Sequence, residues 1–245
     1  MDNRILTHRY FLTAGECDGN ARMPLPLLVS RLIEVATEHA NLLGIGYDRL
    51  ITLNLAWVLS RVSVEISRLP GINESYSVAT WIESTNRLFS ERCFTLSDAS
   101  GKPFAHARTT WAAIDIALRK PTNPGVLGDI MFPADPLPCP VAPAPRMKPL
   151  PDSARSETYT FRYCDLDFNR HVNTVRYVDL ILNHWPLDWH DTHSVARFDI
   201  TFIRESHFGE TADLRVADDG PQSLCELLIA GDRRLTAAIT WRPRN

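Results

Sequence analysis

The sequence predicts an α+β protein made of two tandem units, each a curved antiparallel sheet wrapped around one long helix. Two observations predict this fold class. The same order of elements (a strand, a loop, a long helix and four further strands) occurs twice along the chain, and a proline-rich segment separates the two copies. The length of 245 residues suits two compact units of roughly 110–130 residues each.

The separating segment spans residues 132–151, and its prolines rule out a helix or a central strand because each one lacks a backbone donor. We interpret it as an extended linker between a first domain at residues 1–131 and a second at residues 152–245. A long surface loop within one domain is the alternative. The prolines are Pro133, Pro136, Pro138, Pro140, Pro143, Pro145, Pro149 and Pro151.

In the first half, a strand-like run ends at Asp18, and residues 25–43 carry apolar side chains at helical spacing. Four strand-like runs follow, at residues 56–67, 75–83, 88–97 and 103–116. Short strands after a single helix predict an antiparallel sheet. A helix that is apolar along one stripe packs on one face of such a sheet.

The second half repeats this order. A strand is expected at residues 158–163 and a helix at 173–185. The four expected strands that follow are residues 195–204, 211–216, 223–230 and 235–242. The closing strands are alike in sequence, with Arg-Thr-Thr-Trp-Ala-Ala at 108–113 beside Thr-Ala-Ala-Ile-Thr-Trp at 236–241.

Composition excludes several classes of protein. The net charge of −3 and the absence of a concentrated basic face argue against a nucleic-acid binder. No run approaches the roughly 18 apolar residues of a membrane helix, and no signal peptide is visible. The cysteines are odd in number, scattered and without Cys-x-x-Cys spacing, which favours reduced thiols in a cytoplasmic protein. They are Cys17, Cys93, Cys139, Cys164 and Cys225.

The candidate active site lies just before the second helix, in Asp-Leu-Asp-Phe-Asn-Arg-His-Val-Asn at 165–173. If this stretch is extended, Asp167, Asn169 and His171 point to one side. The helix that follows presents free N–H groups and the positive end of its dipole. The first half has Asp-Gly-Asn-Ala-Arg-Met at 18–23, with Arg22 in place of the histidine. We therefore expect one active site and one silent copy.

The motif at 165–173 resembles the Asp-Leu-Asp-x-Asn-x-His-Val-Asn signature of the plant and bacterial acyl-acyl-carrier-protein (acyl-ACP) thioesterases. Phe-Ile-Arg-Glu-Ser at 202–206 and Asn-Leu-Ala-Trp-Val at 54–58 also resemble segments of that family. The resemblance covers nearly the whole chain in order. It implies two hotdog folds, hydrolysis of fatty acyl-ACP, acyl carrier protein as partner, and neither a metal nor an organic cofactor.

The resemblance also implies catalytic roles for Asp167, Asn169, His171 and Glu205. It places the chemistry in the second half and the selection of the acyl chain mainly in the first. Where the plant enzymes have a cysteine after the glutamate, this chain has Ser206, so a cysteine-nucleophile scheme would lack its nucleophile. Candidates for lining an acyl tunnel in the first half are Trp57, Leu59, Trp81, Phe89 and Trp111.

A thioester has a good leaving group, since a thiol has a pKa of roughly 8.5. The enzyme must therefore activate water and stabilise an oxyanion. Glu205 or Asp167 would activate the water, although attack by Asp167 itself stays open. His171 would orient or share the proton, Asn169 would hold the water or polarise the carbonyl, and N–H groups at the helix start would bind the oxyanion.

Other functions stay open at this point. Coenzyme A could replace the carrier protein as the thiol. A hotdog enoyl-thioester hydratase resembles Asp-x-Asn-Pro-x-His, which has one more residue between Asp and His than this chain has. A non-catalytic acyl-binding module would suit the half without histidine. Asp167 and Asn169 could also serve only to form a turn and cap a helix. Chain-length preference and association into a homodimer are not determined by the sequence.

Overall fold

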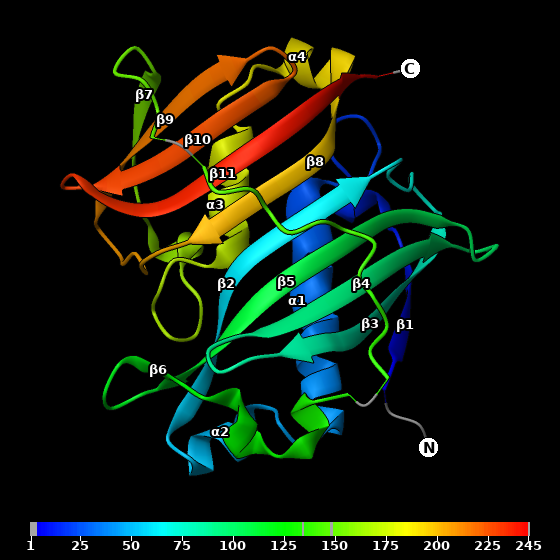
Figure 1. The fold of residues 1–245 in the computed structure, drawn as a ribbon. Coiled ribbons are helices and arrows are strands. Elements are labelled where there is room, and N and C mark those ends of the chain that lie inside the picture. The colour runs from blue at the N-terminus through cyan, green and yellow to red at the C-terminus, as the bar shows by residue number, and fades with distance from the viewer. Residues whose placement is uncertain (1–3, 134, 148, 245) are drawn as a thin grey trace. The chain divides into compact units, whose positions relative to one another are not determined.

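The computed structural model describes residues 4–133, 135–147 and 149–244. The chain divides into two compact units, Met1–Pro143 and Ala144–Asn245. The proline-rich segment expected at residues 132–151 spans this division. Each unit is an antiparallel sheet with one long helix against it, so the α+β prediction is confirmed (Figure 1).

The described residues of the first unit form five main strands in the order β1-β3-β4-β5-β2, each antiparallel to its neighbour. The strands are β1 (Leu6–Phe11), β2 (Leu55–Ile66), β3 (Ser75–Thr85), β4 (Ser90–Asp98) and β5 (Pro103–Asp115), with β6 (Lys120–Thr122) paired to β5. Its helices are α1 (Leu25–Leu42), α2 (Tyr47–Thr52) and the short 3₁₀ turns η1 (Ala14–Glu16), η2 (Pro124–Leu127) and η3 (Asp129–Met131).

Helix α1 follows the predicted apolar stripe. Leu28, Leu32 and Val35 are fully or almost fully buried, because residues three and four apart share one face of a helix. The helix begins after Pro24, and a proline in its first turn loses no intrahelical bond. The chain then turns at Gly44, whose φ of 71° is a conformation that glycine adopts without strain.

In the second unit, the part of the chain that the structure describes forms five strands in the order β8-β11-β10-β9-β7, again antiparallel throughout. Its elements are β7 (Arg155–Thr160), η4 (Tyr163–Asp165), α3 (Thr174–Leu182), α4 (Leu187–Thr192), β8 (His193–Phe202), β9 (Thr211–Asp219), β10 (Gln222–Ile229) and β11 (Asp232–Pro243). Helix α3 ends three residues before the predicted 185, consistent with Pro186, which disfavours helical geometry in the residue before it.

Two short helices, α2 and α4, and the small strand β6 are absent from the sequence prediction. The predicted strand at 158–163 also begins too late, because β7 runs from Arg155 to Thr160 and the chain then turns into η4. No helix among the described residues is long and apolar enough to cross a membrane.

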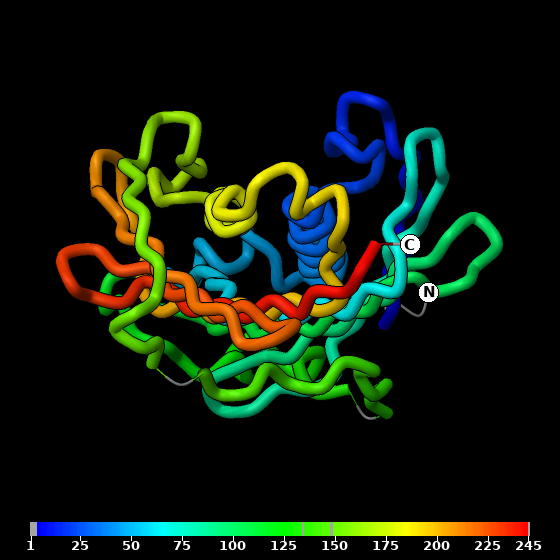
Figure 2. Tube along the Cα trace, turned by 90° about the horizontal axis from the view of Figure 1, so that it is seen from above, coloured from blue at the N-terminus to red at the C-terminus, as the bar shows by residue number. Residues whose placement is uncertain are grey.

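The part of the proline-rich segment at residues 135–143, here called the strap, is bound to the first sheet. The indole N–H of Trp81 donates to the carbonyl of Leu137 at 2.8 Å. The guanidinium of Arg108 donates to the carbonyl of Val141 at 2.9 Å, and Val141 is fully buried. Figure 2 shows this segment on the face of the first sheet opposite α1. The strap is therefore part of the first unit's packing.

Candidate active site

The loop before α3 is a tight turn, so the condition of an extended stretch is not met, and Asp167 forms the turn that the sequence also allowed. Oδ1 of Asp167 accepts the backbone N–H groups of Asn169 at 2.8 Å and of His171 at 3.0 Å. The N–H of Asp167 in turn donates to the carbonyl of His171 at 2.8 Å. Arg170 has a φ of 64°, which brings the chain back on itself. The Asp167 carboxylate is thus engaged by the backbone of its own loop, as in an Asx turn.

Asp165 anchors the same loop to the start of α3. It is 6% exposed, and its Oδ2 accepts the N–H of Arg162 at 2.7 Å and the hydroxyl of Tyr159 at 3.0 Å. Its carbonyl accepts the N–H of Asn173 at 2.8 Å. Asp165 is therefore a structural acid, and the loop it holds presents His171 beside the helix start.

Glu205 and His171 meet, as the sequence predicted. Their Oε2 and Nε2 atoms lie 3.4 Å apart, and each side chain is about one-third exposed. The contact is supported by the backbone, because Val172 donates to the carbonyl of Ser206 at 2.8 Å. An isolated β-bridge also pairs His171 with His207. The loop between β8 and β9 thus places the Glu205 carboxylate beside the imidazole of His171.

His207 is a site residue that sequence analysis missed. Its Nε2 lies 3.9 Å from Oε1 of Glu205, and its ring packs edge-on against that of His171, with 5.2 Å between the ring centroids. The Glu205 carboxylate therefore has an imidazole near each oxygen. The only signal in the sequence was a second histidine two residues after the glutamate, which has no counterpart in the motif.

The start of α3 leaves one amide for a ligand. Oδ1 of Asn173 caps the helix by accepting the N–H of Val175 at 3.1 Å, and the carbonyl of Asn173 accepts the N–H of Arg176. Between Val172 and Arg176, all of which the structure describes, only the N–H of Thr174 donates to no protein acceptor. A carbonyl oxygen that develops negative charge would be stabilised by such a donor.

Ser206 does not reach the surface. It is fully buried, and its hydroxyl lies beside that of Tyr177, on the buried face of α3. Burial raises the pKa of Tyr177 to about 12. Neither hydroxyl makes a well-aligned hydrogen bond within the described part of the chain. A substrate could not approach Ser206 in this structure.

The first unit repeats the loop almost bond for bond. Oδ1 of Asp18 accepts the N–H groups of Asn20 at 2.9 Å and Arg22 at 3.0 Å, and the N–H of Asp18 donates to the carbonyl of Arg22 at 2.8 Å. Ala21 has a φ of 54°, as Arg170 has a positive φ in the second unit. The copy thus keeps the turn that the sequence associated with the active site.

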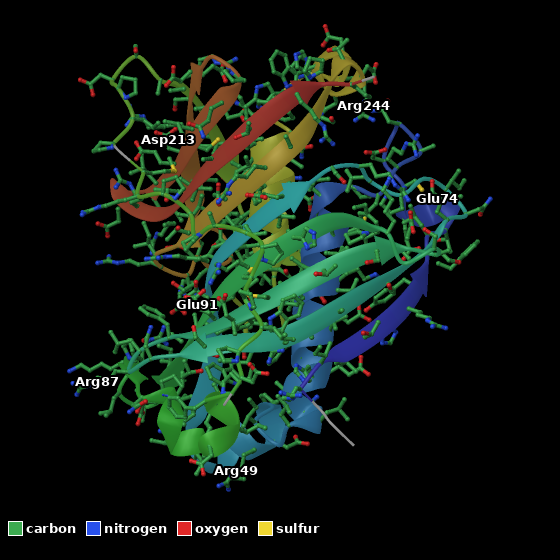
Figure 3. The ribbon with its side chains drawn as sticks, turned by 45° about the vertical axis from the view of Figure 1, so that its right-hand side comes forward. Arg49, Glu74, Arg87, Glu91, Asp213 and Arg244 are labelled. Carbon is green, nitrogen blue, oxygen red and sulfur yellow. The ribbon has the colours of Figure 1, made fainter. Side chains whose placement is uncertain are left out.

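The loop of the first unit has neither the imidazole nor the carboxylate of the candidate site. Arg22 stands where His171 stands and pairs with Glu74 at 3.7 Å, a residue that Figure 3 labels. Leu69 occupies the position of Glu205. The alignment follows from the next residue, because the carbonyl of Pro70 accepts the N–H of Met23 as the carbonyl of Ser206 accepts the N–H of Val172. The first unit therefore has the framework of the site without its acid–imidazole pair.

Three of the five predicted lining residues share one face of the first sheet. Trp57 packs against the core cluster that includes Ala40 of α1, and Leu59 lies two residues further along β2 and opposite Trp111. Alternation along strands puts these three side chains on the helix side. Trp81 is adjacent in β3 to Ile82, which faces the helix, and its indole N–H donates to the strap. Trp81 therefore lies on the opposite face of the sheet.

Phe89, the fifth predicted lining residue, precedes β4 in a turn whose backbone is bound to Asn86. The structure therefore brings together Trp57, Leu59 and Trp111 and leaves Trp81 and Phe89 apart from them. The aromatic composition of the segment could not show which face each ring occupies. Among the described residues, no group of three or more His, Cys, Asp or Glu side chains is placed to hold a metal ion.

Two tandem helices, each against its own antiparallel sheet, with an acid–imidazole pair at the start of the second, define a double-hotdog protein of the thioester hydrolase class. Family models match both units: the acyl-ACP thioesterase N-terminal domain at residues 3–131 and the acyl-ACP thioesterase C-terminal domain at residues 149–243. The chain belongs to the acyl-ACP thioesterase family.

Curated relatives and solved structures that resemble this chain include acyl-ACP thioesterases. The chain is 24% identical to oleoyl-acyl carrier protein thioesterase 2, chloroplastic, of Arabidopsis thaliana over 94% of its length and 67% of the relative's. It is 25% identical to the palmitoyl-acyl carrier protein thioesterase, chloroplastic, of Gossypium hirsutum over 84% of its length and 53% of the relative's. The chain thus spans between about half and two thirds of these plant proteins.

An acyl-ACP thioesterase from Bacteroides thetaiotaomicron shares the fold with a TM-score of 0.92 and 31% identity, covering 98% of this chain and 99% of that one. The 12:0-ACP thioesterase from Umbellularia californica matches with a TM-score of 0.88 and 21% identity, covering 98% of each chain. The double-hotdog prediction is confirmed by these structures.

Proposed function

We propose that this chain hydrolyses fatty acyl-ACP thioesters in its second unit and releases the free fatty acid and the carrier thiol. The observation that carries the proposal is the contact between Glu205 and His171, 3.4 Å apart at the start of α3. The family supplies the substrate class, and the acid–imidazole pair supplies groups that can move a proton at neutral pH.

In the proposed reaction, Glu205 takes a proton from a water molecule while the water oxygen attacks the thioester carbon. The carbonyl oxygen becomes an oxyanion, which accepts the N–H of Thr174 at the positive end of α3. The carbon–sulfur bond then breaks and its electron pair goes to sulfur. The proton taken from water passes from Glu205 to His171 and on to the thiolate, so atoms and charges balance.

Asp167 and Asn169 have supporting roles in this proposal. The Oδ1 atom of Asp167 is engaged by two backbone amides, which suits a residue that positions His171 more than it suits a base or a nucleophile. The Asn169 side chain is exposed and has no hydrogen-bond partner among the residues that the structure describes. Its amide is available to hold the attacking water or the carbonyl oxygen.

We assign the acyl chain to the first unit, at residues 1–131, and the chemistry to residues 152–245. Trp57, Leu59 and Trp111 support this assignment because they place apolar surface on the helix side of the first sheet. The five free cysteines suit a reducing compartment such as the cytoplasm. Association into a homodimer stays a prediction.

The test is release of free thiol from acyl-ACP by purified wild type and by Glu205→Gln. We expect the variant to lose at least about 100-fold in kcat, in line with the loss of a general base. Glu157→Gln is the matched control, because Glu157 also pairs with an imidazole, that of His184 at 2.9 Å, in the same unit. It should retain activity within about twofold. An active Glu205→Gln would overturn the assignment.

A hydratase would behave differently in the same assay. It would consume an enoyl thioester without releasing thiol and would leave a hydroxyacyl product. A binding module would retain acyl-ACP without turnover. Thiol release that matches fatty acid one for one would exclude both alternatives.

A further inference from the structure

Three neighbouring strands of the first sheet present a row of side chains to the strap. Trp81 of β3 is paired with Cys93 of β4, and Cys93 is paired in turn with Arg108 of β5 (Figure 1). Residues paired in this way share one face of a sheet. Arg92, the residue before Cys93, bonds to His39 of α1. Cys93 and the other two members of the row therefore face away from the helix.

The strap crosses this row with every second residue in contact with it. The carbonyls of Leu137 and Val141 accept hydrogen bonds from the first and last side chains of the row. Cys139 lies midway between these two anchors, and its sulfur is 3.6 Å from the carbonyl oxygen of Ala107 in β5. The strap therefore places Cys139 over the middle member of the row, which is Cys93.

The thiols of Cys93 and Cys139 share a hydrogen bond, and they differ in access to water. Cys93 is fully buried, whereas Cys139 is half-buried. The hydrogen bond from Cys93 lowers the pKa of the Cys139 thiol and raises that of Cys93. The guanidinium of Arg108 also favours the Cys139 thiolate, although its ion pair with Glu83 offsets part of its charge. Cys139 is thus the sulfur that a reagent in water reaches, and the thiolate is the reactive form.

We propose that Cys93 and Cys139 are a redox modification site, at which a hydroperoxide forms a disulfide that fastens the strap to the first sheet. A disulfide forms without backbone rearrangement only where two cysteine side chains already meet. In a reducing compartment such a bond is transient and responds to oxidant. The site lies within the first unit and does not depend on the proposed hydrolysis.

The reaction consumes one hydrogen peroxide for each cysteine pair. The Cys139 thiolate attacks one peroxide oxygen and the O–O bond breaks. The departing hydroxide takes up the proton that the thiol had lost, so water leaves and a sulfenic acid remains. The Cys93 sulfur then attacks the sulfenic sulfur, the S–O bond breaks, and the hydroxyl leaves as water with the Cys93 proton. Two thiols are oxidised and one peroxide is reduced to two waters.

The test treats the reduced full chain with equimolar hydrogen peroxide, alkylates the remaining thiols and digests with trypsin without a reductant. The expected product joins peptide 93–108 to peptide 120–146, which contain Cys93 and Cys139, respectively. Dithiothreitol should remove the link, and Cys139→Ser should prevent it. The matched control is Cys164→Ser, which removes an exposed cysteine of the second unit and should give the link as wild type does.

Two further measurements follow the order of the steps and the effect on the strap. Cys93→Ala should stop the reaction at the sulfenic acid, which dimedone labels on Cys139. Oxidised wild type should melt at least about 5 °C above the reduced protein, because the link restricts the unfolded chain between the two cysteines. Oxidant should give no such rise in Cys139→Ser.

The contrary outcomes are distinct from one another. A link between other cysteines or between two chains overturns the site, and so does a Cys139 sulfenic acid in wild type that never proceeds to the disulfide. A disulfide that forms without raising the melting temperature overturns the fastening of the strap. Thiol release from acyl-ACP is measured separately, so failure of this site is distinguished from failure of the proposed function.

Discussion

Loop 13–22 and loop 162–171 have the same turn, yet only the second has an acid–imidazole pair. Asp18 and Asp167 bind the same two backbone amides, and Ala21 and Arg170 share a positive φ. The difference teaches that Asp-x-Asn in this chain is a framework for the loop. The capacity for chemistry comes from His171 and from Glu205, which the framework brings together.

The largest effect should come from replacing His171, and the same replacement at its equivalent position in the first unit should have little effect. His171→Gln should lose at least about 100-fold in kcat, because the proton then has no relay to the sulfur. Arg22→Gln, at the equivalent position of the copy, should stay within about threefold. Steady-state thiol release measures both. Comparable losses for the two variants would mean that the first unit is not silent.

The framework aspartates should matter equally for stability and unequally for activity. Asp18→Ala and Asp167→Ala each remove the acceptor of two backbone amides, so each should lower the free energy of unfolding by about 1–3 kcal/mol. Only Asp167→Ala should also lower kcat. Denaturant unfolding and thiol release on the same samples provide the comparison.

Asp167→Asn separates positioning from direct chemistry, because asparagine keeps an acceptor oxygen but cannot serve as a base or a nucleophile. We expect activity within about tenfold of wild type. A loss of 100-fold or more in a folded Asp167→Asn protein would place that carboxylate in the reaction.

Ser206→Ala should change kcat by less than about threefold. The hydroxyl is fully buried, and its counterpart in the first unit is Pro70, which supplies the same backbone acceptor without any hydroxyl. An inactive Ser206→Ala protein with a native unfolding midpoint, or an acylated serine found by mass spectrometry, would contradict this.

The smallest effect at neutral pH is expected for Tyr177→Phe. Tyr177 occupies the helix position of Leu28 in the first unit. Burial raises its pKa to about 12, so the folded state favours the neutral phenol over the phenolate. The stability it contributes is complete below the unfolded pKa of about 10 and is lost as pH rises towards 12. The variant's unfolding free energy should therefore fall less steeply than that of wild type between these pH values.

The sequence was sufficient for the elements with strong periodicity. Helix α1 and strands β2 to β5 fall within a few residues of their predicted limits, because apolar spacing reports which face is buried. The six-residue helices α2 and α4 are too short to show such spacing. Pairing of His171 with Glu205 was also predicted, although through family resemblance, because no local pattern relates residues so far apart.

The features that the sequence did not predict depend on backbone geometry and on which face of a strand each side chain occupies. An arginine at position 170 gives no sign of a positive φ, so the sequence did not decide between an extended stretch and a turn. Trp81 was grouped with Trp57 although Ile82 takes the helix side of β3. His207 was overlooked because its role appears only when the bridge to His171 is seen.

The strap affects how family members could be recombined. Cys139 donates its N–H to Glu83 at 2.6 Å, and Trp81 and Arg108 bind the strap on either side of it. A hybrid protein joined at residue 131 would graft a foreign peptide onto these three side chains. A junction after Pro143 would transplant the first unit together with its own covering segment.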